Sequence, residues 1–161
     1  MEEKIKTFHR HERGFTILEL LLVMSIVAIL AASGVGYYRN TVHRIGVSTA
    51  GKIFIADTQT MRSKAMVGEQ GRRWGVHVVN DPTQGQYYQL FSTPTIYTDP
   101  LMEITATTTL PSGVSFSDPL PGMSKDILFK GITGQTVSTT VVMFSETDVA
   151  TTTITSMGLV Y

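Results

Sequence analysis

The 161-residue chain contains no cysteine. This absence excludes disulfides, thiol catalysis and cysteine-ligated metal sites, and it is compatible with a reducing or an exported location. Net charge is absent as well, because thirteen Lys and Arg residues balance thirteen Asp and Glu residues. A neutral chain gives no bulk indication of a nucleic-acid or other polyanionic partner. At this length we expect one ordinary domain with room for an appendage.

The sequence also lacks the residue patterns that enzymes use. It contains no nucleophile elbow, phosphate loop or HExxH motif, and no histidine has a metal-ligand spacing among His9, His11, His43 and His77. A Ser-His-Asp arrangement assembled by folding would leave no such pattern. We therefore predict a protein that is not an enzyme and has no metal or cofactor. A membrane-tethered enzyme that uses His43 and His77 is the alternative.

Charge is missing from one long segment, residues 20–38, whose side chains are mostly apolar. As a helix these residues would be about 28 Å long, close to the hydrocarbon thickness of a bilayer. The segment is therefore predicted to span a membrane. One alternative is a buried core helix, which so small a domain can hardly surround. The other is a secretory signal cleaved near Ala31-Ala32-Ser33, for which the apolar run is long.

Glu19 lies directly before this segment and follows the uncharged residues 14–18, so it is a carboxylate near the start of a longer, mostly apolar stretch. Burying its carboxylate in lipid would cost about 3 kcal/mol, so the side chain either reaches water at the interface or has a functional partner. The surrounding residues resemble the processing site of type IV prepilins and type II secretion pseudopilins: Arg13-Gly14-Phe15-Thr16-Ile17-Leu18-Glu19-Leu20. In that family a short basic leader and a glycine precede Phe-Thr-Leu-Ile-Glu and a membrane helix; here Ile17 and Leu18 exchange places.

The resemblance implies that a prepilin peptidase cleaves between Gly14 and Phe15 on the cytoplasmic side, and that the new amine of Phe15 is methylated. It also implies that Glu19 supplies a negative charge for the Phe15 amine of an adjacent subunit. Opposite charges attract strongly in a low dielectric, whereas either one alone is costly to desolvate. The implied partners are other pilin or pseudopilin subunits, the prepilin peptidase, the inner-membrane assembly platform and membrane lipid.

The resulting domain prediction has four parts. Residues 1–14 form a leader that is removed, 15–38 a transmembrane and filament-core helix, 39–71 its continuation into the head, and 72–161 a β-rich head. The implied location is the inner membrane, crossed once, with the N-terminus in the cytoplasm and the head in the periplasm or outside. Four basic residues before the apolar run favour this orientation slightly, although three more follow it by Lys52.

Helical periodicity continues beyond the apolar run. Apolar residues recur at spacings of three, four and seven and share one helical face: Val47, Ala50, Phe54, Met61 and Ala65. We expect the head to cover this stripe, and Gly68 and Gly71 to end the helix. Gly34 and Gly36 either allow close packing of neighbouring helices or let the helix bend during filament assembly.

After residue 80 the composition changes, since all six prolines and most threonines lie there. β-branched residues favour strands, and proline and glycine mark turns. Strands are predicted at 74–79, 87–92, 104–109, 114–117, 126–130, 137–144, 149–155 and 159–161, with tight turns at 80–85 and 146–148. The fold class is therefore α+β. A long N-terminal helix would pack its second half on an antiparallel sheet, as in type IV pilins.

Weaker motifs are similar to those of the GspH/FimT minor pseudopilins: residues 110–116, residues 127–134, residues 154–160 and Arg62-Ser63-Lys64-Ala65. This similarity implies a low-abundance tip or initiation subunit. The chain departs from major pseudopilins, which carry a Trp- and Asp-containing calcium segment near the C-terminus. It also has no basic residue after Lys130, which argues against DNA capture through an Arg-rich C-terminal segment.

The one basic cluster in the head consists of Arg62, Lys64, Arg72 and Arg73, with Trp74 beside it. Such a cluster either contacts a ligand or forms a solvated face that pairs with acidic groups of neighbouring subunits. The first reading gives the alternative function, a binding module at a pilus tip that acts as an adhesin or DNA receptor. The leading prediction remains a structural filament subunit.

Overall fold

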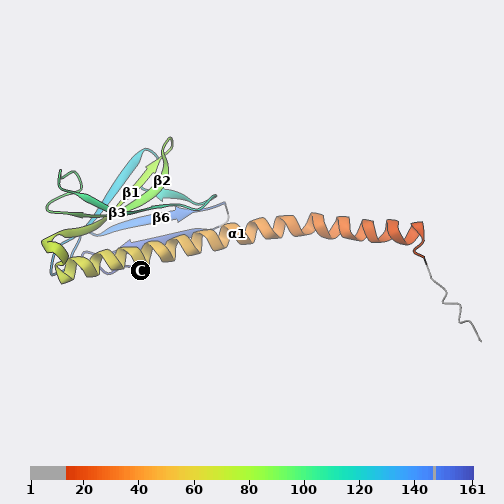
Figure 1. The fold of residues 1–161 in the computed structure, drawn as a ribbon, viewed down its shortest axis with the longest axis horizontal. Helices are drawn as coiled ribbons and strands as arrows, with labels where there is room; N and C mark the ends of the chain where they lie inside the picture. The colour runs from red at the N-terminus through yellow and green to blue at the C-terminus, as the bar shows by residue number, and fades with distance from the viewer. Residues whose placement is uncertain (1–13, 147) are drawn as a thin grey trace, which may run out of the picture. The chain divides into compact units, whose positions relative to one another are not determined.

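The computed structural model describes residues 14–146 and 148–161, without the side chains of residues 33–43. The chain divides into two compact units, residues 1–38 and 39–161. Helix α1 (Ile17–Val67) contributes to both, and the second unit adds a short 3-10 helix η1 (Glu69–Gly71) (Figure 1). Its strands are β1 (Arg73–Asp81), β2 (Gly85–Thr93), β3 (Glu103–Thr109), β4 (Ser115–Asp118), β5 (Met123–Phe129), β6 (Thr139–Phe144) and β7 (Val149–Ile154). A long helix followed by antiparallel strands confirms the α+β class.

The strands form two antiparallel sheets. One has the order β3-β2-β1-β5 and the other has the order β4-β6-β7. Strand β1 is central in the larger sheet, where Val76 lies opposite Leu90 of β2 and Ile127 of β5. Within the second unit, Figure 1 shows β6 running beside the yellow half of α1.

The head core lies between α1 and the two sheets. The predicted helical stripe is confirmed, because all five of its residues are buried: Val47, Ala50, Phe54, Met61 and Ala65. Thr58 completes the same face, and its hydroxyl donates to the Phe54 carbonyl oxygen at 2.7 Å, so its polar atom is satisfied. The sheets supply Trp74, Val76 and Val78 from β1, with apolar side chains of the other strands. Their alternation with outward residues follows the two-residue period of a strand.

Most predicted strands lie within three residues of the observed bounds, and the end of the helix and the last predicted strand call for separate comment. Helix α1 ends at Val67, so the prediction that Gly68 ends the helix is confirmed, although the helix segment predicted for 39–71 stops before residue 71. Gly68 adopts a left-handed φ of 69° and its N–H bonds to the Ala65 carbonyl oxygen at 3.1 Å. Residues 159–161 form no strand. They make one isolated bridge, between Ile154 and Val160, so too few consecutive residues pair to form a ladder.

The predicted hairpin between β1 and β2 is confirmed. Asp81 Oδ1 accepts hydrogen bonds from the Thr83 N–H at 2.7 Å, from the Thr83 hydroxyl at 2.6 Å and from the Gln84 N–H at 3.1 Å. These bonds, the Thr83 hydroxyl first, lower the pKa of the Asp81 carboxyl. An Asx turn therefore fixes the register of the two strands.

Candidate functional site

The predicted cleavage site lies just before α1 begins. Gly14, Phe15 and Thr16 are not helical, and Phe15 is 82% exposed. A Cβ atom added at Gly14 would meet nothing within 4 Å. Packing within the described chain therefore does not require a glycine at this position. The rest of the predicted leader, with His9 and His11, lies outside the described residues.

Thr16 is the N-cap of α1, a role that the sequence analysis missed. Its hydroxyl oxygen accepts from the Glu19 N–H at 3.2 Å, and its carbonyl oxygen accepts from the Leu20 N–H at 3.1 Å. The Thr-x-x-Glu spacing of a capping box was the available signal. The backbone N–H of Glu19 makes the capping bond, so the Glu19 carboxylate remains available for another partner.

The Glu19 side chain is exposed in the first turn of α1, where a negative charge interacts favourably with the helix dipole. No ion pair among the described residues includes Glu19. The large apolar side chains that follow are exposed as well, with Leu18 at 76% and Leu30 at 66%. This half of α1 thus presents one carboxylate among apolar side chains that the described chain leaves uncovered.

The predicted membrane helix covers residues 15–38. When only the described residues are considered, no helix is both long enough and apolar enough to cross a membrane.

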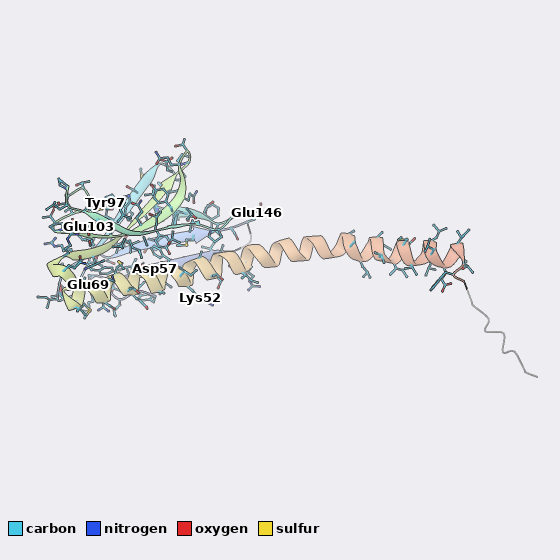
Figure 2. All side chains as sticks on the ribbon, viewed as in Figure 1. Lys52, Asp57, Glu69, Tyr97, Glu103 and Glu146 are labelled. Atoms are coloured by element: carbon cyan, nitrogen blue, oxygen red, sulfur yellow. The ribbon has the colours of Figure 1, made fainter. Side chains whose placement is uncertain are left out.

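The basic cluster is largely engaged within the head. Arg72 forms an ion pair with Glu103 at 2.9 Å and donates to the Leu101 carbonyl oxygen at 2.9 Å (Figure 2 labels Glu103). Arg73 donates to the Thr95 carbonyl oxygen at 3.3 Å. Both arginines therefore fasten the segment 94–102, which joins β2 to β3.

The position of Trp74 argues against a site in which this aromatic ring and the basic side chains bind a ligand together. Its side chain is 2% exposed, and its indole N–H donates to the Glu69 carbonyl oxygen at 3.1 Å. Lys64 Nζ lies 4.3 Å from the ring centroid and 3.3 Å from a carboxylate oxygen of Glu69. A base could not stack on this indole, because strand alternation turns it into the core with Val76.

Arg62 is separated from the other basic residues. Its Nη2 donates to the Met157 carbonyl oxygen at 3.3 Å, and its Nε is buried without a partner in the described chain. Gly134 and Gly158 crowd the same guanidinium, since an added Cβ would lie 3.2 Å and 2.8 Å from Arg62 Nε. Arg62 thus contacts two loops near the end of α1, those that contain Gly134 and Met157.

His77 belongs to a cluster that the sequence did not reveal. Its Nδ1 hydrogen-bonds with Asp126 Oδ1, and its ring stacks on Tyr97 with centroids 3.7 Å apart. The Tyr97 hydroxyl donates to Gln89 Oε1 at 2.7 Å. Burial first, and then the nearby Tyr87 and Asp126, raise the pKa of the Tyr97 hydroxyl. The cluster attaches the segment 94–102 to the outer face of the larger sheet.

The enzymatic alternative would require a nucleophile or a metal beside His77 or His43. In the described part of the chain, no serine or threonine hydroxyl hydrogen-bonds to His77, and the side chain of His43 lies outside that part. Among the described residues, no three or more histidine and acidic side chains are grouped so that they could hold a metal ion.

Residues 9–35 match the family model described as the prokaryotic N-terminal methylation motif. The match supports a type IV pilin-like family. It covers the N-terminal segment and ends before the head, so it does not distinguish a pilus from a pseudopilus subunit or test the similarity to GspH/FimT. Comparisons with curated proteins and with solved structures gave no match. The motif favours a structural protein over an enzyme.

Proposed function

We propose that this chain is a structural subunit, a minor pilin or pseudopilin, of a type IV pilus or a type II secretion pseudopilus. A prepilin peptidase removes residues 1–14, the amine of Phe15 is methylated, and the mature chain joins a filament through α1. The observation that carries the proposal is the methylation motif at residues 9–35, whose range includes the exposed apolar start of α1.

The surroundings of the cleavage site support processing. Gly14 and Phe15 precede the first helical turn and are exposed, so a peptidase can reach the bond between them. No described atom would crowd a side chain at position 14, so folding does not require a glycine there. Recognition by the peptidase would explain why the residue is a glycine. Thr16 begins the helix immediately afterwards, which leaves the new amine of Phe15 one residue before the N-cap.

The apolar half of α1 supports membrane anchoring followed by assembly. Leaving a large apolar side chain in water instead of burying it costs about 1.5–3 kcal/mol, and many such side chains follow one another here. Membrane lipid would cover them before assembly, and neighbouring helices of the filament would cover them afterwards. The subunit would then sit in the inner membrane with its head in the periplasm or outside, and the assembly platform would extract it.

The charge of Glu19 supports a defined axial position of each subunit relative to its neighbour. A carboxylate in an apolar helix is costly alone, and the methylated amine of Phe15 on an adjacent subunit would neutralise it. The two groups lie four residues apart in the sequence, so the pairing would set an axial offset between adjacent helices. We further propose a place among the GspH/FimT-like minor subunits, which rests on the loop motifs at residues 110–116 and 154–160.

The mass of the N-terminal peptide tests this proposal. The full chain would be produced in cells with a prepilin peptidase, isolated from their membranes and digested, and a strain without the peptidase would serve as the control. We expect a peptide that begins at methylated Phe15, and in the control strain one that begins at Met1. A Met1 terminus in both strains would refute processing and remove the main support for a filament subunit.

A further inference from the structure

Ile132 combines two unfavourable features beside the C-terminal end of α1. Its φ is 69°, a left-handed conformation that a β-branched residue rarely adopts, and its side chain is 80% exposed. The Ile132 N–H donates to the Ala65 carbonyl oxygen at 2.9 Å, a backbone bond that any residue except proline could make. Asparagine or glycine would adopt this φ more readily. Neither the turn nor the end of the helix therefore requires an isoleucine.

Three further apolar side chains are exposed beside Ile132, at 43–83% of their surface: Met66, Val67 and Met157. The turns that carry them are in contact. A Cβ atom added at Gly134 would lie 2.7 Å from Met66 Cγ, and one added at Gly158 would collide with the Gly134 carbonyl oxygen. The four side chains therefore form one surface, which we call the apolar tip. It is carried by three segments of the head: residues 62–71, 130–136 and 155–159.

The charges around the apolar tip are mostly positive. Its three segments contain three basic residues and one acidic residue, Glu69. Glu69 is paired with Lys64 at 3.3 Å. The other two basic residues, Arg62 and Lys130, form no ion pair within the described chain. Two positive charges therefore remain without a counter-charge next to four exposed apolar side chains.

We propose that the apolar tip docks on the surface of an anionic lipid bilayer. The four apolar side chains would lie among the acyl chains, and Lys130 would reach a lipid phosphate while its methylene stem stays on the apolar surface. Anionic headgroups attract each basic residue near the surface, so the unpaired charges of the tip match such a bilayer. This contact is additional to the proposed anchoring through the first half of α1.

The shape of the tip favours a bilayer over a protein partner. Val67 and Ile132 are 83% and 80% exposed, so they project from the surface of the head. A protein partner would need a cleft that fits these projections and carboxylates that meet the two basic residues. A bilayer accepts projecting apolar side chains without a matching cleft, and its headgroups supply the negative charge. The strained isoleucine then has a role that the fold does not give it.

Flotation of the full chain with lipid vesicles tests the proposal. The chain would be held in phosphatidylcholine nanodiscs, which cover the exposed apolar half of α1. The nanodiscs would be titrated with vesicles of phosphatidylglycerol and phosphatidylcholine in equal parts, and the fraction of the chain that floats with the vesicles gives an apparent affinity. Vesicles of phosphatidylcholine alone and nanodiscs without protein are the controls.

Ile132→Asn separates a lipid contact from a structural role, because asparagine accepts a positive φ and removes the apolar side chain. We expect it to weaken the apparent affinity about tenfold. We also expect it to raise the melting temperature by about 2–4 °C, since it relieves strain. Leu120→Asn is the matched control, because Leu120 is 60% exposed in the connection between β4 and β5. Its effect on the affinity is expected to stay below about twofold.

Lys130→Gln tests the charge of the tip without touching its apolar side chains. We expect it to weaken the affinity for the anionic vesicles about fivefold and to reduce its dependence on salt. Equal affinities of the parent chain and Ile132→Asn would overturn the proposal. Equal flotation with anionic and phosphatidylcholine vesicles would overturn it as well. A parent chain that floats with neither kind of vesicle would also refute it and would leave a protein as the partner of the tip.

The vesicle measurement is separate from the mass of the N-terminal peptide, so this proposal and the proposed function can fail independently.

Discussion

At the scale of single residues, Glu19 is the side chain on which assembly depends in the proposed function. Its carboxylate is exposed, and only its backbone takes part in capping the helix. We expect Glu19→Ala to leave the cap intact and to remove the counter-charge for the Phe15 amine of the adjacent subunit. Loss of one partner of a desolvated ion pair costs about 3–5 kcal/mol, enough to abolish incorporation into filaments. Filaments sheared from cells and immunoblotted provide the measurement.

Glu19→Gln is the matched control for shape, since it keeps the size and hydrogen-bonding capacity of the side chain and removes its charge. We expect it to fail as Glu19→Ala does, while both variants stay in the membrane with a folded head by circular dichroism. Normal incorporation of the glutamine variant would show that charge is not what Glu19 contributes.

Ionisation of Tyr88 is expected to lower the free energy of unfolding of the head at alkaline pH. Its buried hydroxyl donates to Asp57 Oδ2 at 2.6 Å, and burial first, then this bond, raises the pKa of Tyr88 above its ordinary value of 10.0. As pH rises through about 10, the unfolded chain loses the Tyr88 proton before the folded chain does. The free energy of unfolding is therefore unaffected by this group below that pH and falls above it.

Urea unfolding between pH 7 and pH 11, followed by circular dichroism, measures this effect. Tyr88→Phe is expected to lower the free energy of unfolding by about 1.5–3 kcal/mol at pH 7, because Asp57 loses its donor. Its curve is expected to be flatter than that of the parent above pH 10. Parallel curves for the two proteins would contradict the assigned role of Tyr88.

At the scale of elements, the second half of α1 is held to the sheets by its buried stripe. Phe54 is fully buried, and its ring meets that of Tyr88 edge-on with centroids 5.1 Å apart. Its neighbour Ile53 is 47% exposed. We expect Phe54→Ala to lower the free energy of unfolding by about 3–5 kcal/mol and Ile53→Ala by about 1 kcal/mol or less. Equal losses in urea titrations would mean that the face of α1 has been assigned incorrectly.

The sequence predicts elements with a regular period. Spacings of three, four and seven identify the buried face of α1, and alternation identifies β1 and β2. The same alternation could have placed Trp74 inside, since it shares a face with Val76 and Val78. Its position beside basic residues led instead to the hypothesis of an exposed patch. The end of α1 at Gly68 was predicted from its glycine, whereas the cap at Thr16 was missed although its Thr-x-x-Glu spacing is a local signal.

Features formed by distant residues could not be predicted. Asp126 meets His77 only because β5 pairs with β1 rather than with its neighbours in the sequence. Tyr97 lies in an irregular segment, and nothing periodic indicates that it stacks on His77. The predicted cleavage and assembly roles of Gly14, Phe15 and Glu19 come from family resemblance, so they remain predictions. The local residue pattern predicts the helix and most strands of this chain. Contacts such as those of His77 depend on which strands pair, and the local pattern does not show this.

At the scale of the whole molecule, the head holds the described core. Among the side chains that the structure describes, every buried hydrophobic one lies between Val47 and Ile154, within the unit 39–161. A chain that begins at Arg39 loses none of them. We therefore expect residues 39–161 to fold without the first unit and to unfold in one cooperative transition. Its melting temperature should lie within about 4 °C of that of the full chain in detergent, which corresponds to about 1 kcal/mol.

Circular dichroism of the two proteins checks this expectation, and Phe54→Ala in the shorter chain serves as a destabilised reference. A shorter chain that melts without a cooperative transition would show that the head needs residues 1–38.

Trp74 is the only tryptophan of the chain, and it connects the last turn of α1 to the first strand. The Lys64 ammonium lies over its ring, and the Glu69 carbonyl oxygen accepts from its indole. Its fluorescence therefore reports from a single place, the junction of helix and sheet. A red shift of the emission when subunits enter a filament would reveal that the head loosens from its helix. An unchanged spectrum would mean that the head travels into the filament intact.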